Sequence, residues 1–229
     1  METQRKKILL GLTTTPGSDW RGKIEEMKRF GIGEISLFPT YLKKEERKEL
    51  YCLLEDFDGL SVPHIHLRDD MDEAELAYLG ERFRPVAYNT HESVRGKGQF
   101  LEYRDMIFIE NHFHLADEAV LETYAGMCLD TQHLHRSRFE APMAFFHVMR
   151  LLRSGILVGC FHISPMPLLR NRAERKRRGI SGHYMIDLSE LEYVSRYAKY
   201  LPDIVSIEME NSFEEQLRAK GVLEKIVNG

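Results

Sequence analysis

The sequence of 229 residues contains little cysteine and no long hydrophobic run. Its three cysteines, Cys52, Cys128 and Cys160, are odd in number and widely spaced, which argues against both a disulfide framework and a CxxC metal site. No apolar stretch reaches the roughly 18 residues that a membrane-spanning helix needs, and no signal-peptide cleavage pattern follows the N-terminal apolar residues. We therefore expect a cytoplasmic protein without a membrane role.

A strong excess of charge is also absent. The net charge is −4, from 32 Lys and Arg against 36 Asp and Glu, so the chain has no general attraction to nucleic acid. The basic run "RNRAERKRRG" at residues 170–179 is a local exception. Such a run is either a solvated charged segment or a lid that supplies Arg170 and Arg172 to a phosphate or carboxylate.

The sequence lacks low-complexity linkers, literal repeats and a GxGxxG fingerprint after its first predicted strand. The missing fingerprint argues against a dinucleotide-binding open sheet. A chain of this length can bury one large core. We therefore expect one domain over residues 1–229.

Short apolar runs alternate with amphipathic stretches along the chain. Such alternation is typical of parallel strands joined by helices. About eight such units in a short chain favour a single, compact (β/α)₈ barrel with a shortened or missing helix, and a doubly wound sheet is the alternative. The predicted strands lie at residues 7–15, 33–39, 60–67, 85–91, 105–110, 124–130, 156–163 and 203–210.

Chemically active side chains gather where these strands end, which is the face that carries the active site in such barrels. The ten histidines all follow residue 63, and we expect only His147 within a helix. The candidate residues are His64, His66, His91, Glu110, Asp130, His133, His162, His183, Glu208 and Glu210.

This clustering points to a metal ion. A single histidine at a strand end is usually a hydrogen-bonded loop residue, and Asp130 alone would be an ordinary helix cap. Six consecutive predicted strands ending in His, Asp or Glu are harder to explain in that way, because converging carboxylates repel each other without a positive charge among them. Imidazoles and carboxylates without a thiolate suit Zn²⁺, Mn²⁺, Co²⁺ or Fe²⁺.

The succession "HIHL", "NTH", "IEN", "CLDTQH", "CFH" and "SIE" resembles the xylose isomerase-like TIM-barrel superfamily over nearly the whole chain, and "LDTQH" is the most specific match. Its isomerase and epimerase branch implies Glu110, Asp130, His162 and Glu208 as ligands of one divalent metal. The resemblance also implies Glu110 and Glu208 as an acid/base pair, with His133 contacting the substrate.

The endonuclease IV branch of the same superfamily holds several zinc ions with additional histidines. The positions that match them here are His66, His91, His133 and His183. In a site with one metal, these residues would contact the substrate instead. Ser181 stands where that branch has an aspartate, two residues before the loop histidine, which puts a third metal in doubt.

Duplex DNA is the less favoured partner. Where the endonuclease branch has a bulky wedge, this sequence has Asp69 and Asp70, which would repel phosphates. We therefore expect an isomerase or epimerase acting on a small polar substrate such as a sugar, keto-sugar or sugar phosphate. The alternatives are a phosphoester hydrolase and a metal-containing binding module. Glu210 lies two residues after Glu208, on the same face of the predicted strand, and is the alternative ligand.

Overall fold

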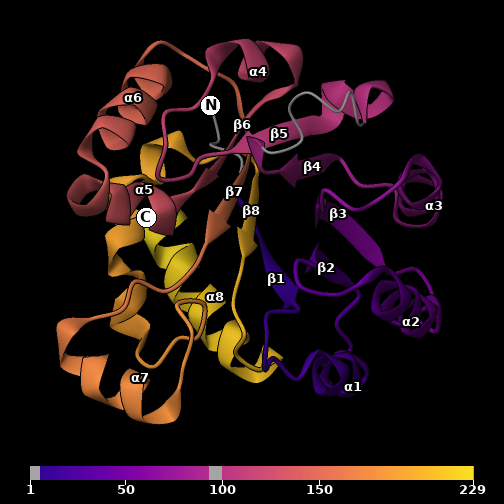
Figure 1. Cartoon of the computed structure of the whole chain (residues 1–229). Coiled ribbons are helices and arrows are strands. Elements are labelled where there is room, and N and C mark those ends of the chain that lie inside the picture. The colour runs from indigo at the N-terminus through magenta and orange to yellow at the C-terminus, as the bar shows by residue number, and fades with distance from the viewer. Residues whose placement is uncertain (1–5, 93–99, 229) are drawn as a thin grey trace.

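The computed structural model describes residues 6–92 and 100–228, and in it eight parallel strands close into a barrel in sequence order (Figure 1). The predicted (β/α)₈ fold is therefore confirmed. The basic loop at residues 94–99 lies outside the described residues. The strands are β1 (Lys7–Thr13), β2 (Glu34–Phe38), β3 (Ser61–His66), β4 (Ala87–Thr90), β5 (Ile107–Glu110), β6 (Gly126–Asp130), β7 (Val158–Ile163) and β8 (Ile204–Ile207).

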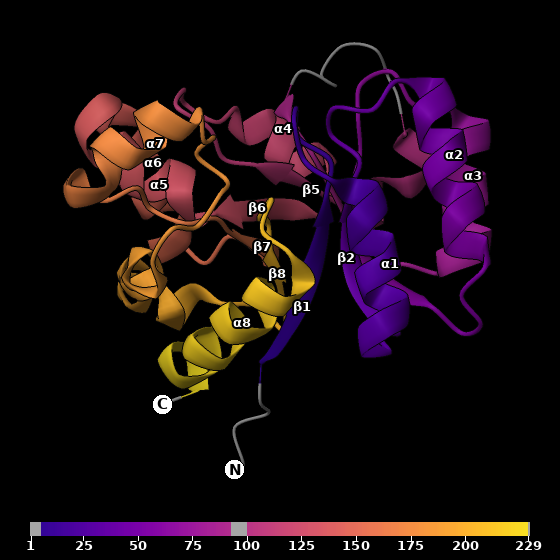
Figure 2. The same ribbon diagram turned by 90° about the horizontal axis from the view of Figure 1, so that it is seen from below.

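Helices surround the barrel, and Figure 2 shows α1, α2 and α3 along one side and α8 beside β1 and β8. The α-helices are α1 (Trp20–Phe30), α2 (Lys44–Glu55), α3 (Glu73–Phe83), α4 (Glu118–Thr123), α5 (Thr131–Glu140), α6 (Pro142–Arg153), α7 (Arg172–Arg178) and α8 (Phe213–Asn228). The expected shortening occurs at α4, which has six residues. Between β4 and β5, the longest helical segment in the described part of the chain is the 3₁₀-helix η2 (Leu101–Met106).

Residues 187–201, one of the amphipathic stretches between the predicted strands, do not form an α-helix. They form two 3₁₀-helices, η4 (Leu188–Arg196) and η5 (Ala198–Tyr200). The Glu190 carbonyl accepts a hydrogen bond at 2.8 Å from the Met166 amide, while the Glu190 carboxylate pairs with Arg175 at 2.6 Å. These tertiary bonds take groups that an α-helix would use within itself or leave in solvent.

Alternation along the strands separates an outer core from the barrel interior. On β6, Met127 and Leu129 pack into the large core shared with the helices. Cys128 instead joins a separate interior cluster with Phe108 and Cys160. Because side chains alternate with period 2, Asp130 follows Cys128 on the inward side, at the end where the strand stops.

The seam between β1 and β8 is closed by a side chain. The ladder pairs Lys7 to Leu9 with Ile204 to Ser206, and a Cβ atom on Gly11 would lie 1.8 Å from the Ile207 carbonyl oxygen. Beyond this close approach, Gln216 of α8 accepts from the Gly11 amide at 2.8 Å and donates to its carbonyl at 2.9 Å. The buried amide therefore replaces the missing ladder bonds.

None of the helices in residues 6–92 and 100–228 is both long and apolar enough to span a bilayer.

Candidate metal centre

The barrel brings four of the sequence-predicted residues to one end. Glu110 and Asp130 are the last residues of β5 and β6, His162 lies near the end of β7, and Glu208 directly follows β8. All four side chains are buried. The register pairs Asp130 with His162 across β6 and β7, so these two neighbours are at the same height in the barrel.

The distances between these side chains suit a shared cation. His162 Nδ1 lies 3.4 Å from Glu110 Oε2 and 3.6 Å from Glu208 Oε2. One ligand atom from each of Glu110, Asp130 and His162 lies within 4.8 Å of the other two. Ligand atoms of one ion lie about 2.0–2.2 Å from it. The atoms of this group would therefore have to move only slightly closer to one another to share an ion.

Unpartnered polar atoms mark the middle of this group. Asp130 Oδ2 and both ring nitrogens of His162 are buried and have no hydrogen-bond partner in the described part of the chain. A buried polar atom without a hydrogen-bond partner costs free energy, and a hydrogen bond or a bound metal ion would offset that cost. Carboxylates and an imidazole are the donors that divalent transition metals accept. The residues present therefore fit a divalent metal ion.

Asp130 is oriented by backbone bonds on both sides. Its Oδ1 accepts from the His133 amide at 2.7 Å and so caps α5. The Asn111 side chain accepts from the Asp130 amide at 2.7 Å and donates to its carbonyl at 3.1 Å. With the backbone and Oδ1 fixed, Oδ2 is directed into the group.

Glu110 is held by an amide and by imidazoles. Asn89 Nδ2 donates to Glu110 Oε2 at 2.8 Å, and His66 Nε2 lies 3.2 Å from the same oxygen. His91 Nε2 and His133 Nδ1 lie 3.7 and 3.5 Å from Oε1. Both carboxylate oxygens of Glu110 therefore face nitrogen atoms.

The electrostatic surroundings divide the carboxylates into two kinds. Burial would raise the pKa of Glu110, but the nearby His162, His66 and His91 outweigh it and hold that pKa well below its usual value. Burial, reinforced by Glu110 and Asp130, raises the pKa of Glu208 well above the ordinary range. Burial is also the largest cause that lowers the pKa of His162 well below its ordinary value. Without a cation, the group therefore cannot hold all its carboxylates ionised at neutral pH.

Glu210 lies in a different hydrogen-bond network. Its Oε1 accepts from Ser181 Oγ at 2.6 Å and from the Thr15 hydroxyl. The expectation that Glu208 and Glu210 share one strand face is wrong, because β8 ends at Ile207 before either residue. The chain turns there, and the two carboxylates have separate partners.

The additional histidines come from different elements and differ in burial. His66 is buried on β3, and His91 is half exposed just after β4. His133 lies in the first turn of α5, and His135 also belongs to this helix, so the expectation that only His147 sits in a helix is wrong. His183 contacts Ser164 Oγ through Nδ1 at 3.1 Å. One ligand atom from each of His66, His91 and Glu110 also lies within 4.8 Å of the other two.

Arg170 and Arg172, the residues of the basic run expected at the site, have their side chains exposed and away from this group. Arg170 is exposed, pairs with Asp187 at 3.2 Å and donates to Ser189. Arg172 begins α7 and is also exposed. The buried member of the run is Arg175, whose partner is Glu190. The run therefore forms a short helix anchored by Arg175.

Sequence reasoning missed several side chains that line or support the group. Asn89 and Asn111 orient Glu110 and Asp130, and both are buried. The His112 ring centroid lies 4.7 Å from that of His133, and burial with the neighbouring His133 and His91 lowers the pKa of His112 to about 4. Asn89 could have been found from alternation, since it is two residues from His91. Asn111 and His112 follow the strand and carry no such signal.

No family model and no curated protein matches the sequence. Among solved structures, the chain is similar to the probable 3-DHS dehydratase AsbF of Bacillus anthracis, with 14% identity and a TM-score of 0.43 over 97% of both chains. It is also similar to dihydropteroate synthase of Thermus thermophilus, with 17% identity and a TM-score of 0.47 over 96% of this chain and 95% of that chain. These likenesses concern the fold alone.

Proposed function

We propose that the protein is a divalent-metal-dependent isomerase or epimerase of a small sugar, keto-sugar or sugar phosphate. The observation that carries this proposal is the buried group of Glu110, Asp130 and His162, in which Asp130 Oδ2 and both nitrogens of His162 have no hydrogen-bond partner in the described residues. Glu208 completes the set through its approach to His162. The ion would be Zn²⁺, Mn²⁺, Co²⁺ or Fe²⁺.

When bound, such a metal supplies a Lewis acid that binds two adjacent substrate oxygens and polarises a carbonyl. Glu110 at the end of β5 and Glu208 just after β8 both lie beside His162, which supports a role for both in proton transfer. One of Glu110 and Glu208 takes a proton from the carbon next to the carbonyl, and the other returns one. The His133 ring, partly exposed beside Glu110, would contact a substrate hydroxyl.

Deuterium exchange tests this proposal directly. The metal-loaded protein is incubated in deuterated buffer with a panel of aldoses, ketoses and their phosphates, and NMR follows exchange at the carbon next to the carbonyl. We expect exchange with at least one class and a loss of about 10²-fold or more in Glu208→Gln, as is typical when an acid/base group is removed. Glu210→Gln, a matched change outside the metal group, should retain exchange. Absence of exchange across the whole panel would contradict the proposal.

A specific observation favours hydrolysis of phosphoesters as the second candidate. His66, His91 and Glu110 form another group with ligand atoms within 4.8 Å, and this group shares Glu110 with the first. Two metals about 3.5–4 Å apart would stabilise the attacking and leaving oxygens of a phosphoester. Release of phosphate or nitrophenol from simple phosphoesters, dependent on two bound ions per chain, would support this function over isomerisation.

A further inference from the structure

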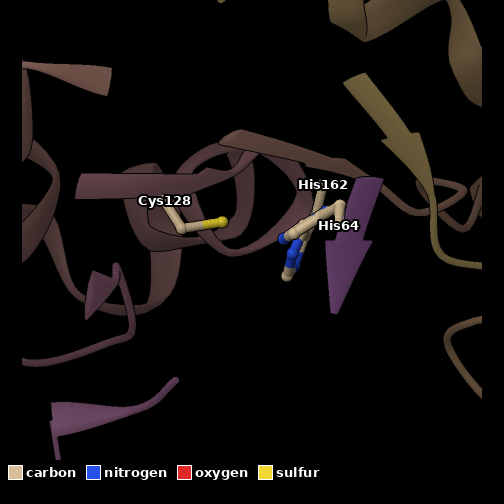
Figure 3. Close-up of side chains that lie close together, drawn as sticks. All are labelled: His64, Cys128 and His162. Carbon is tan, nitrogen blue, oxygen red and sulfur yellow. The ribbon is translucent and has the colours of Figure 1, made fainter. Parts of the chain in front are cut away.

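A second group of metal-ligating side chains lies deeper in the barrel. His64 on β3, Cys128 on β6 and His162 on β7 each offer one ligand atom, and these atoms lie within 4.8 Å of one another. All three side chains are fully buried. Figure 3 shows the sulfur of Cys128 pointing toward the imidazole rings of His64 and His162. The centroids of these rings are 5.1 Å apart.

Hydrogen bonds fix which nitrogen of His64 carries its proton. Asn89 donates its amide N–H to the Glu110 carboxylate, so its carbonyl oxygen is the atom that lies 3.0 Å from His64 Nε2. An amide oxygen only accepts, and His64 Nε2 therefore carries the hydrogen. His64 Nδ1 is left with a lone pair.

The lone pair on His64 Nδ1 faces a serine hydroxyl. This hydroxyl can turn away and leave the lone pair free for a metal ion. Nδ1 lies 2.7 Å from Ser206 Oγ, a hydroxyl that can rotate to another acceptor. Histidines that bind metals nearly always donate their other ring N–H to an oxygen acceptor, which fixes the tautomer. His64 already has this arrangement, with Asn89 as the acceptor.

His162 links the two levels of the barrel. It belongs both to the carboxylate group and to the group with Cys128, and neither of its ring nitrogens has a hydrogen-bond partner in the described chain. An ordinary buried histidine satisfies at least one nitrogen. With an ion on each side of its ring, His162 would bind both as an imidazolate, and its N–H proton would pass to solvent.

We propose that His64, Cys128 and His162 form a second, thiophilic metal site inside the barrel, which takes Zn²⁺ or a similar borderline-soft cation. Thiolate and imidazole are the donors that zinc combines in structural sites. On binding, the Cys128 thiol loses its proton to solvent and a sulfur–metal bond forms. The site is separate from the carboxylate centre in donor type and shares only His162 with it.

Charge favours both ions together. Glu110, Asp130 and Glu208 bring three negative charges to the upper site, one more than a divalent cation neutralises. On the interior side, one thiolate, the neutral His64 and a half share of the His162 imidazolate leave the ion with an excess of positive charge. Opposite excess charges on either side of His162 attract each other strongly in a buried environment.

Cobalt substitution tests the site with a readout other than catalysis. All proteins carry Cys52→Ser, because Cys52 is exposed and would bind metal adventitiously. In this parent protein we expect about two Co²⁺ ions per chain and thiolate-to-cobalt charge-transfer absorption in the near ultraviolet. The added change Cys128→Ser should abolish that absorption and remove about one ion. Absorption that persists after Cys128→Ser, or that is absent in the parent at saturating Co²⁺, would overturn the proposal.

Two further measurements separate this site from the carboxylate centre and from misfolding. Asp130→Asn should remove the other ion and leave the charge-transfer absorption in place, so failure of the upper site has a different signature. X-ray absorption at the zinc edge of the unmodified protein needs no variant. We expect a sulfur scatterer at about 2.3 Å, and a shell of only nitrogen and oxygen at about 2.0–2.1 Å would refute the interior site.

Discussion

Asp130 accepts a hydrogen bond from the His133 amide through Oδ1 at 2.7 Å, while its Oδ2 has no hydrogen-bond partner among the residues that the structure describes. One carboxylate therefore has two separable roles, capping α5 and offering a metal ligand. Asn keeps the capping oxygen, since Asn and Asp are nearly equal as N-caps. It replaces the ligand oxygen with an amide NH₂ group, which cannot bind a cation.

We therefore expect Asp130→Asn to lower metal affinity by at least about 10-fold and to change the melting temperature of the metal-free protein little. Elemental analysis after dialysis against Mn²⁺ or Zn²⁺ measures the first effect, and thermal unfolding with chelator measures the second. Asp19→Asn is the matched control, because Asp19 caps α1 in the same way through the Gly22 amide. Equal metal content in both variants would remove Asp130 from the ligand set.

Glu208 and Glu210 are separated by a pair of substitutions. Glu208 Oε2 lies 3.6 Å from His162 Nδ1, whereas the Glu210 carboxylate is bonded to Ser181 and Thr15. We expect Glu208→Gln to lose metal and Glu210→Gln to retain it. Isothermal titration with Mn²⁺ measures both affinities. The reverse result would show that the loop after β8 rearranges to exchange the two glutamates.

His91 distinguishes a tight ion from a weaker one. It belongs to the group with His66 and Glu110 but not to the group with Asp130 and His162. We expect His91→Ala to leave the tightly bound ion in place and to remove only an ion that binds at higher metal concentration. His114→Ala serves as the control, because His114 is exposed and bonded to Glu92 at 2.7 Å. Loss of the tight ion in His91→Ala would contradict the assignment.

Gln216 links the closure of the barrel to the loop that follows Glu208. Besides Gly11, its amide donates to the carbonyls of Met209 and Asn211, at 3.2 and 3.0 Å, in the loop that follows Glu208. Gln216→Leu removes this partner from Gly11 and from the Asn211 carbonyl, at about 1–3 kcal/mol for each group that water cannot reach, while the Met209 carbonyl keeps its bond from Lys23. We expect a melting temperature lower by roughly 5 °C or more and weaker metal binding. Leu217→Gln, an exposed neighbour on α8, should change neither.

Lys23 gives the stability a pH dependence of defined sign. Its buried ammonium donates to the Met209 carbonyl at 2.7 Å, and burial lowers its pKa from 10.5 to about 7, against the opposing pull of Glu210 and Glu26. Between these two values, the unfolded chain binds more protons than the folded chain, so this lysine makes folding more favourable as the pH rises.

Lys23→Met should remove that contribution. We expect the difference in unfolding free energy, wild type minus variant, to increase between pH 7 and pH 10 by an amount on the order of a few kcal/mol. Below pH 7 the difference should be constant, because both states are then protonated. Urea unfolding at several pH values measures it. A flat difference from pH 7 to pH 10 would mean that Lys23 stays charged in the folded protein.

The fold could be predicted because its periodic signals are local. Each strand is a short apolar run, and helices such as α1 and α8 have the expected apolar spacing. The start of α5 was less clear, because Asp130 reads equally as a cap and as a ligand, and the structure gives it the geometry of a cap. The 3₁₀ form of η4 could not be predicted, since the bonds of Glu190 to Met166 and Arg175 are tertiary.

The position of the candidate metal group could be predicted for the same reason, but the hydrogen-bond partners of its side chains could not. In a parallel barrel all strands end on one face, so the last residues of β5 and β6 must meet those of β7 and β8. The period-2 rule stops where a strand stops, which is why it failed for Glu210. Ser181 and Thr15 hold that carboxylate from loops whose paths depend on the whole fold. Likewise, Arg170 and Arg175 of the basic run pair with Asp187 and Glu190, which are contacts that depend on the whole fold.

The two hydrogen bonds between Gln216 and Gly11 also have a consequence for synthesis on the ribosome. The Gly11 amide and carbonyl are made 205 residues before their partner on α8. Until that helix leaves the exit tunnel, β1 has an open edge toward β8, and such edges invite pairing with other chains. The nascent barrel is therefore more open to aggregation at this edge until α8 has formed.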